Sequence, residues 1–337
     1  MPNITWIGNP FFAESLKRPG INLHYADCPA GTHMGWDEVL AIGGTPDLLV
    51  VADKSLPPFI LGMENFPCLT ALYVIDSHIH SWFPYYAQAF DFCLVSLKDH
   101  LPRFRDERLP DERIFWFPPY YKGEPSSPEV AAAHEKLWDI LFVGTLNPLV
   151  NPERIEWMER FRALEPRLHT TSGDYKALNP QARLILNHSI AGDLNFRVFE
   201  TLGTGAPLLS PRLAHGLEDL FSDGEDLFLF DQEDVTGAAK RAGELLGQPE
   251  KMLEAAWSGY KKVNSKHLAM HRADRLLEIA LNWLESGQTA GLIAERLKNA
   301  KSIRRDYLRL IYLLLAESLK GFPEMQKAYL AAASKSD

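Results

Sequence analysis

Residues 183–212 constrain the fold of this chain more than any other part of its sequence. They combine a short apolar run, a polar turn, an amphipathic helix pattern that ends at glycine, and a second apolar run that begins Ala-Pro. The helix pattern sets Asn195, Arg197 and Glu200 beside an apolar stripe that faces a core. The stretch therefore predicts a strand, loop, helix and strand unit whose helix carries polar groups able to hold a ligand.

Short apolar runs followed by polar, Gly or Pro turns recur along the rest of the chain. The predicted strands are residues 4–8, 48–52, 70–75, 92–95, 114–117, 139–143, 168–171 and 227–230, and the predicted helices of the second half include residues 153–164, 234–246 and 250–260. Strands that alternate with helices form mostly parallel sheets covered on both faces. The sequence thus predicts an α/β protein with Rossmann-like, doubly wound sheets.

The chain of 337 residues is long enough for two cores of about 150 residues each. Pro118-Pro119 and the segment KGEPSSPE that follows have the composition of a linker. The predicted divisions are an N-terminal domain at 1–125, a C-terminal domain at 130–285, and a helical extension at 286–337.

The helical extension carries an apolar face that includes Leu308, Ile311, Leu315 and Leu319. Such a face must be buried against something. We expect it to pack on the N-terminal domain, and self-association through these helices is the alternative.

Composition and charge exclude several classes of partner. Hydrophobic residues at 46% and charged residues at 23% are values typical of a globular protein. The net charge of −9 argues against nucleic acid or an anionic membrane as the main partner.

No apolar run approaches the roughly 20 residues that span a bilayer, and no secretory signal opens the sequence, so we expect a cytoplasmic protein. The three cysteines lack CxxC spacing and predict no disulfide frame.

Ligands of doubly wound sheets bind beyond the carboxyl ends of the strands. Residues 76–80 (Asp-Ser-His-Ile-His) follow a predicted strand of the first half directly and contain an acid and two imidazoles. Asp76 or His78 could act as a general base, because imidazole titrates near neutral pH and a carboxylate can fix its tautomer. The His-x-His spacing beside an aspartate also suits a metal ion. The structural alternative is that Asp76 caps the next helix while both histidines pack on Trp82 and Tyr85.

The turn Gly144-Thr145 follows a predicted strand of the second half. Glycine lets the backbone approach whatever lies above the sheet, and a phosphate is one candidate. A plain connection is the alternative interpretation.

An ordered set of motifs in the second half resembles a known family. These motifs are Asn187-His188-Ser189, the run Asn195-Phe196-Arg197-Val198-Phe199-Glu200, Gly205-Ala206, the run from Gly216 to Phe221, and His271-Arg272-Ala273. In this order they resemble the C-terminal domain of the spore-maturation-type (CgeB-like) glycosyltransferases. The resemblance implies two Rossmann-like domains facing a cleft, the GT-B arrangement, with a nucleotide-sugar donor on the second domain and an acceptor approached from the first, where Asp76 loosely matches a family aspartate.

The resemblance implies specific roles for the residues of this stretch. Glu200 would accept hydrogen bonds from the ribose hydroxyls and Arg197 would hold a phosphate. The backbone N–H groups before Asn195 would favour an anion at a helix start, and Asn187 and His188 would reach the donor. The structural alternative is a helical ion pair between Arg197 and Glu200, which are spaced i,i+3.

One position departs from the pattern of many retaining GT-B enzymes. These enzymes carry Glu-x7-Glu, whereas Gly192 stands eight residues before Glu200 here and Asp193 follows it. The sugar-contacting role of a first glutamate cannot be carried over, and retaining and inverting chemistry both stay open.

The sequence thus predicts a glycosyltransferase without metal or cofactor, which moves a sugar from a nucleotide diphosphate donor to a hydroxyl-bearing acceptor. One alternative is a metal-dependent or His/Asp-dependent hydrolase or epimerase on the same frame, and another is a non-catalytic nucleotide or sugar binder. The base, the sugar and the acceptor depend on pocket shape, which the sequence does not reveal.

Overall fold

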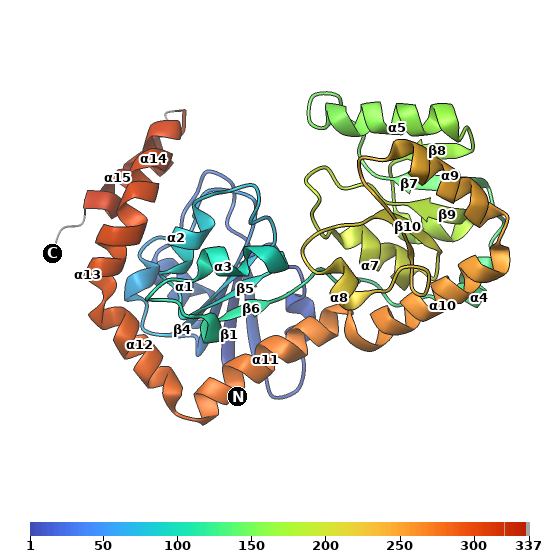
Figure 1. The fold of residues 1–337 in the computed structure, drawn as a ribbon. Coiled ribbons are helices and arrows are strands. Elements are labelled where there is room, and N and C mark those ends of the chain that lie inside the picture. Colours follow the sequence, from blue (N-terminus) through green and yellow to red (C-terminus); the bar gives the residue numbers. More distant parts are fainter. Residues whose placement is uncertain (320, 335–337) are drawn as a thin grey trace. The chain divides into compact units, whose positions relative to one another are not determined.

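A computed structural model describes residues 1–319 and 321–334. The chain forms two compact units, one made of residues 1–118 with 272–337 and the other of residues 119–271. The first unit therefore takes in helical residues that the predicted boundaries gave to the second domain and to a separate extension. Each unit contains its own sheet (Figure 1).

The first unit is built on a parallel six-stranded sheet of order β2-β1-β3-β4-β5-β6. Its elements are β1 (Asn3–Gly8), β2 (Asn22–Ala26), α1 (Trp36–Gly43), β3 (Leu48–Ala52), the 3-10 turn η2 (Met63–Asn65), β4 (Leu69–Val74), α2 (Phe83–Ala87), β5 (Phe92–Val95), α3 (Leu101–Phe104) and β6 (Ile114–Trp116). Every residue of β3, β4 and β5 is buried, which explains their unbroken apolar sequences.

The chain changes direction across this first sheet between β1 and β3. After β1 it runs outward to β2, then returns and continues through β3 to β6. Gly8 ends β1 at this point with φ of 112°, and a Cβ there would lie 2.1 Å from the Ala52 carbonyl oxygen. Only glycine permits so close an approach of the two strand ends.

The C-terminal helices complete the first unit. They are α11 (Ala269–Glu285), α12 (Gln288–Lys298), α13 (Ala300–Ile303), the π-helical turn η6 (Arg304–Leu308), α14 (Arg309–Ser318) and α15 (Pro323–Ser334). Leu308, Ile311 and Tyr329 belong to the same hydrophobic core as Leu49, Leu72 and other residues of the sheet. The expectation that the extension packs on the N-terminal domain is confirmed.

Arg296 of α12 anchors this arrangement. Its side chain is fully buried, and its Nε donates to Asp91 Oδ1 at 3.1 Å. Its two terminal nitrogens donate to the carbonyl oxygens of Met63, Phe66 and Cys68 at 2.6 to 2.8 Å. A guanidinium has five N–H donors, so one arginine can satisfy several buried carbonyl groups at once.

The second unit is built on a parallel five-stranded sheet of order β11-β10-β9-β7-β8. Its elements are α4 (Pro128–Ala133), β7 (Trp138–Val143), α5 (Pro152–Leu164), β8 (Leu168–Thr171), α6 (Tyr175–Leu178), β9 (Ala182–Leu186), α7 (Phe196–Gly203), β10 (Leu208–Pro211), α8 (Leu217–Leu220), β11 (Phe228–Phe230), α9 (Val235–Leu246) and α10 (Pro249–Lys266). Helices α5 and α9 share one hydrophobic core with the sheet, and α7 packs against α10 (Figure 1).

The predicted fold class is confirmed. Both sheets are parallel, helices cover them, and residues 183–212 form the expected strand, helix and strand as β9, α7 and β10. The sequence missed β2, whose residues are polar or partly exposed at the sheet edge.

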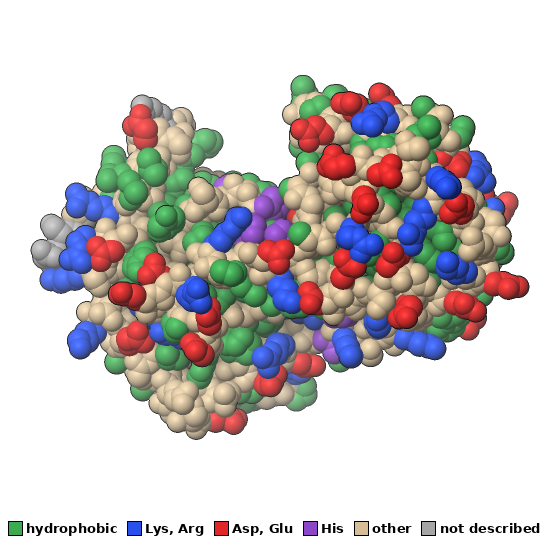
Figure 2. Space-filling view, viewed as in Figure 1, with side chains coloured by type: hydrophobic (Ala, Val, Ile, Leu, Met, Phe, Trp, Pro, Cys, Tyr) green, Lys and Arg blue, Asp and Glu red, His purple; other side chains and the backbone are tan. Residues whose placement is uncertain are grey.

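Acidic and basic side chains are interspersed on the face that Figure 2 shows. Among the helices of the described residues, none is long and apolar enough to cross a bilayer.

Replacing Arg296 with methionine should destabilise the first unit strongly. The change leaves the buried Asp91 carboxylate with Arg108, at 3.5 Å, as its remaining cationic partner in the described chain. Breaking a buried ion pair typically costs about 3–5 kcal/mol. Urea unfolding followed by tryptophan fluorescence measures the loss. Arg305→Met, at an exposed position, should leave the unfolding curve unchanged, and an equal effect of both changes would contradict the anchoring role.

Candidate functional site

The second sheet has its own change of direction, between β7 and β9. From β7 the chain runs outward to β8, then crosses back to β9 and continues to β10 and β11. Ligands of open α/β sheets bind at the carboxyl ends of the strands at such a point. Gly144 and Thr145 follow β7 here, and Asn187 and His188 follow β9. The sequence-predicted residues of the second half therefore converge on the expected place.

Arg197 of α7 joins the two strand ends. Its Nε donates to the Val143 carbonyl at 2.9 Å, and its Nη1 donates to Asn187 Oδ1 at 2.9 Å and to the His188 carbonyl at 3.2 Å. Burial, with the nearby cation Arg154, lowers the pKa of Arg197 to about 10, so the side chain stays charged at neutral pH. The oxygens that accept hydrogen bonds from Arg197 in the described chain all belong to uncharged groups.

Gly144 is needed for this position of Arg197. A Cβ on Gly144 would lie 2.6 Å from Arg197 Nη2 and 2.9 Å from the Phe142 ring. The guanidinium lies over that ring, 4.7 Å from its centroid, in a cation–π contact. The predicted glycine turn is thus a packing requirement for the arginine.

Arg154, in the first turn of α5, brings a second cation to the same place. Its guanidinium lies 5.7 Å from the Phe142 centroid, and its Nη1 donates to the Thr145 carbonyl at 3.2 Å. Its Nε is buried without a hydrogen-bond partner in the described chain. Burial lowers the pKa of Arg154, and the charge of Asp193 counteracts this decrease.

His188 is 4% exposed and lies against Trp157, with ring centroids 4.7 Å apart. Burial, followed by the charges of Arg154 and Arg197, lowers its pKa to about 4. The imidazole is therefore neutral at physiological pH, and its buried Nδ1 has no partner among the described residues. It can offer a hydrogen bond to a ligand, but no permanent charge.

Glu200 lies one helical turn after Arg197, and the two do not form the ion pair of the structural alternative. In the part of the chain that the structure describes, the Glu200 carboxylate has no ion pair or hydrogen bond, while Arg197 bonds to strand-end oxygens instead. Burial raises the pKa of Glu200, and the charges of Arg197, Lys122 and Lys176 counteract this rise. A half-buried carboxylate with unused acceptor capacity is available to a ligand that donates hydrogen bonds.

The start of α7 also has a buried polar atom without a partner among the described residues. Asn195 is the residue before the helix, and its side chain donates to Asn187 Oδ1 at 3.3 Å rather than capping the helix. Its own Oδ1 is buried without a partner in the described residues. Gly192 has a left-handed φ of 68°, and Asp193 accepts a hydrogen bond from Ser189. Gly192 therefore offers no carboxylate in place of the missing first glutamate, and one oxygen of the adjacent Asp193 is already hydrogen-bonded.

In the first unit, Asp53 bonds to the backbone that follows β3 and β4. Its buried carboxylate accepts hydrogen bonds from the backbone N–H groups of Ser55, Ile75 and Asp76. Burial raises its pKa, against the effect of these N–H groups. Asp76 accepts a hydrogen bond from Ser55 Oγ and caps no helix, because α2 begins only at Phe83.

The two histidines of this stretch differ in environment. His78 is exposed, whereas His80 is partly buried and stacks on Trp82, with ring centroids 5.3 Å apart. The packing alternative is therefore right for His80 and wrong for His78 and for the capping role of Asp76. No group of three or more His, Cys, Asp or Glu side chains in the described chain is arranged to hold a metal ion.

Sequence reasoning missed several members of the second-unit site. Arg154 lies in helix α5, whose sequence shows no clear apolar and polar faces. Lys122 lies in the segment interpreted as a linker, and its Nζ lies 4.5 Å from the centroid of the Phe196 ring. Arg154 could have been found from its place in the first helical turn after the glycine turn at a strand end. Lys122 gives no such signal, because residues 119–122 reach the site by pairing with a distant segment: Tyr121 N donates to the His267 carbonyl at 2.8 Å.

Part of the chain matches a known protein family. Residues 129–278 match a family model described as glycosyl transferase-like. No curated protein sequence matches the chain.

Solved structures of similar fold cover both units. The structure of HepE from Anabaena in complex with UDP and glucose is similar with TM-score 0.60 and 10% identity over 84% of this chain and all of HepE. Sucrose-phosphate synthase from Thermosynechococcus elongatus gives 0.59 and 10% over 85% of this chain and all of that one. TarM gives 0.52 and 11% over 69% of this chain, which spans 54% of TarM. These similarities show the fold, which is that of GT-B proteins.

The buried neutral state of His188 predicts a pH dependence of stability. Between about pH 6.5 and 4, the unfolded chain binds a proton at this residue that the folded chain does not. Its contribution is therefore fully present above pH 6.5 and is lost as the pH falls towards 4. Wild type should lose more stability between pH 7 and 5 than His188→Asn in urea unfolding. A His188 imidazole that titrates near pH 6.5 by NMR would contradict this environment.

Proposed function

We propose that this protein is a glycosyltransferase that moves a sugar from a nucleotide diphosphate donor to a hydroxyl group of an acceptor. The observation that carries the proposal is the pair of features at the β7/β9 crossing: two guanidinium groups without a carboxylate hydrogen-bonded to either, and one half-buried carboxylate without a partner among the described residues. A nucleoside diphosphate complements both features, because it carries an anionic end and a ribose with two hydroxyl donors. The family model over residues 129–278 supports the same conclusion.

The donor's parts fit particular residues. Glu200 accepts hydrogen bonds from the ribose hydroxyls, and Arg197 and Arg154 bind the diphosphate. Asn187, His188 and Asn195 border the same strand ends. There the unpartnered Asn195 Oδ1 can accept a hydrogen bond, and His188 Nδ1 can accept or donate one according to its tautomer. Gly144 and Thr145 border the same place, where Gly144 leaves room for the Arg197 guanidinium beside the donor. UDP is the first nucleotide to test, because HepE, of the same fold, has been determined with UDP bound.

The proposed transfer reaction depends on stabilising the negative charge of the leaving diphosphate. The acceptor oxygen forms a bond to the anomeric carbon, the bond from that carbon to the diphosphate breaks, and the leaving diphosphate takes the electron pair. Two fixed guanidinium groups stabilise the charge that develops on it without reorganising during the reaction. If the configuration inverts, Asp76 or His78 of the first unit takes the acceptor proton. The mechanism assigns no role to a metal or cofactor.

Removing the Glu200 carboxylate should weaken UDP binding. Hydrogen bonds to charged groups are each worth about 1.5–3 kcal/mol, so Glu200→Ala should raise the Kd of UDP roughly tenfold to a hundredfold by calorimetry. The ribose assignment adds a sharper expectation: 2′-deoxy-UDP binds wild type more weakly than UDP does, whereas the variant binds both equally. Glu244→Ala, at an exposed site on α9, is the matched control. Unchanged UDP affinity in Glu200→Ala would refute the assignment.

Arg154 should act on the phosphates alone. We expect Arg154→Gln to lower UDP affinity about tenfold and to leave uridine affinity unchanged, because charge-assisted contacts to phosphate are among the stronger hydrogen bonds. Arg160→Gln, on the exposed side of the same helix, should change neither. An equal loss for uridine and UDP would mean that the change distorts the whole site rather than removing a phosphate contact.

A further inference from the structure

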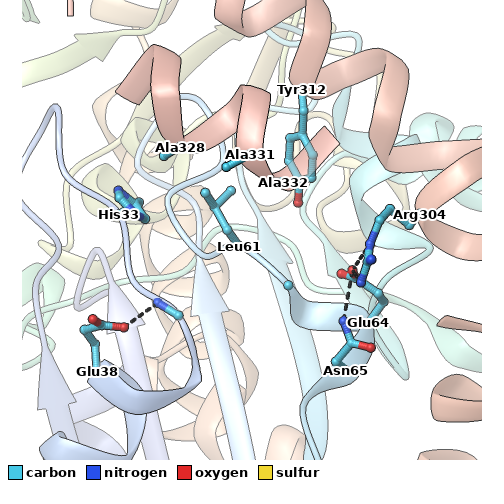
Figure 3. Close-up of a pocket in the computed structure, with 12 residues that line it drawn as sticks. His33, Glu38, Leu61, Glu64, Asn65, Arg304, Tyr312, Ala328, Ala331 and Ala332 are labelled. Atoms are coloured by element: carbon cyan, nitrogen blue, oxygen red, sulfur yellow. Dashed lines mark hydrogen bonds and ion pairs between the residues drawn. The ribbon is translucent and has the colours of Figure 1, made fainter. Parts of the chain in front are cut away.

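The first unit contains a cavity of about 240 Å³ that the proposed donor site does not use (Figure 3). Its walls come from the loop before α1, from η2, from the π-helical turn η6, and from α14 and α15. None of its lining residues is one of the strand-end residues Gly8, Asp53 and Asp76. Its volume is somewhat below the 300 Å³ or more of a typical small-molecule site, which suits a ligand of one small ring.

Two buried polar atoms of the lining residues have no partner within the described chain. Glu64 is 2% exposed, and its Oε1 accepts from Arg304 Nε at 2.8 Å and from Asn65 Nδ2 at 3.1 Å, while its Oε2 accepts from no group. Tyr312 is 1% exposed, and its hydroxyl is likewise unpartnered. Figure 3 shows the Tyr312 ring extending from α14 with its hydroxyl between Leu61 and Arg304. Such atoms are uncommon in folded proteins and call for an explanation.

The side chains around the cavity indicate the chemistry of a ligand. Glu64 and Glu38 both line it, and Arg304, a cation of the same wall, is already paired with Glu64, so the wall disfavours an anion. An apolar ligand would leave the Glu64 and Tyr312 oxygens unsatisfied. A hydroxyl group can donate to a carboxylate and also exchange a hydrogen bond with a tyrosine, so a neutral polyhydroxylated molecule meets both requirements.

The apolar part of the wall fits the same class of molecule. Leu61 and the alanines of α15, Ala328, Ala331 and Ala332, offer small, flat contacts for the C–H groups of a ring. Arg304 enters the cavity from a π-helical turn, and such turns occur frequently at functional sites.

We propose that this cavity is a second carbohydrate-binding site, which holds one neutral sugar residue. Its biological use, the capture of a sugar unit of the acceptor or product, rests on the proposed function. Binding itself does not, because neither a nucleotide nor the donor site takes part.

Saturation-transfer NMR tests the site with glucose, galactose and N-acetylglucosamine, each added without nucleotide. Ala331→Trp places a large ring at the exposed mouth of the cavity, and Leu330→Trp, also exposed on α15 but outside the lining, is its control. Wild type and Leu330→Trp should show saturation transfer to at least one sugar, and Ala331→Trp should reduce it at least fivefold. No transfer to any of the three sugars in wild type, or undiminished transfer in Ala331→Trp, would overturn the proposal.

Tyr312→Phe separates ligand binding from folding. The hydroxyl has no partner in the described chain, so its removal should leave the free energy of unfolding unchanged or raise it, while sugar binding weakens. Full sugar binding by this variant would contradict the role of Tyr312. UDP affinity should be the same in wild type and Ala331→Trp. A wild-type protein that binds a sugar but does not bind UDP would refute the proposed function alone.

Discussion

The immobilised guanidinium of Arg197 is the constraint on which the second unit depends. It is held by the Val143 carbonyl, the Asn187 side chain and the His188 carbonyl, which come from the ends of β7 and β9. Withdrawing a charge from water costs several kcal/mol unless it is compensated, and uncharged oxygens compensate it only in part. An anion bound beside Arg197 would supply the rest, and the arrangement therefore favours a phosphate group at the crossing of the two strands.

The two sheets differ in the charged side chains that bond to the chain at their strand ends. The crossing in the second sheet carries Arg154 and Arg197, whereas the ends of β3 and β4 in the first carry Asp53 and Asp76. Cations suit a diphosphate and carboxylates suit a hydroxyl group that must lose a proton. In the proposed function, the cations of the second unit therefore serve the donor and the carboxylates of the first unit serve the acceptor.

The sequence revealed the parts of the protein that local periodicity determines. Buried strands such as β3 and β4 form unbroken apolar runs, and α7 shows its polar face beside an apolar one, so the fold class and the cluster around Arg197 could be predicted. Contacts between distant segments could not. Arg296 binds carbonyl groups more than 200 positions earlier, and the segment of Lys122 reaches the site only by pairing with residues near His267. Neither leaves a periodic signal, and the unused carboxylate of Glu200 could be recognised only once Arg197 was seen bonded elsewhere.

A crystal structure of the protein with UDP bound would test the central claim most directly. The account predicts that the ribose hydroxyls lie within hydrogen-bond distance of the Glu200 carboxylate and that the diphosphate contacts the guanidinium groups of Arg154 and Arg197. UDP bound elsewhere, or bound here with Glu200 away from the ribose, would contradict it.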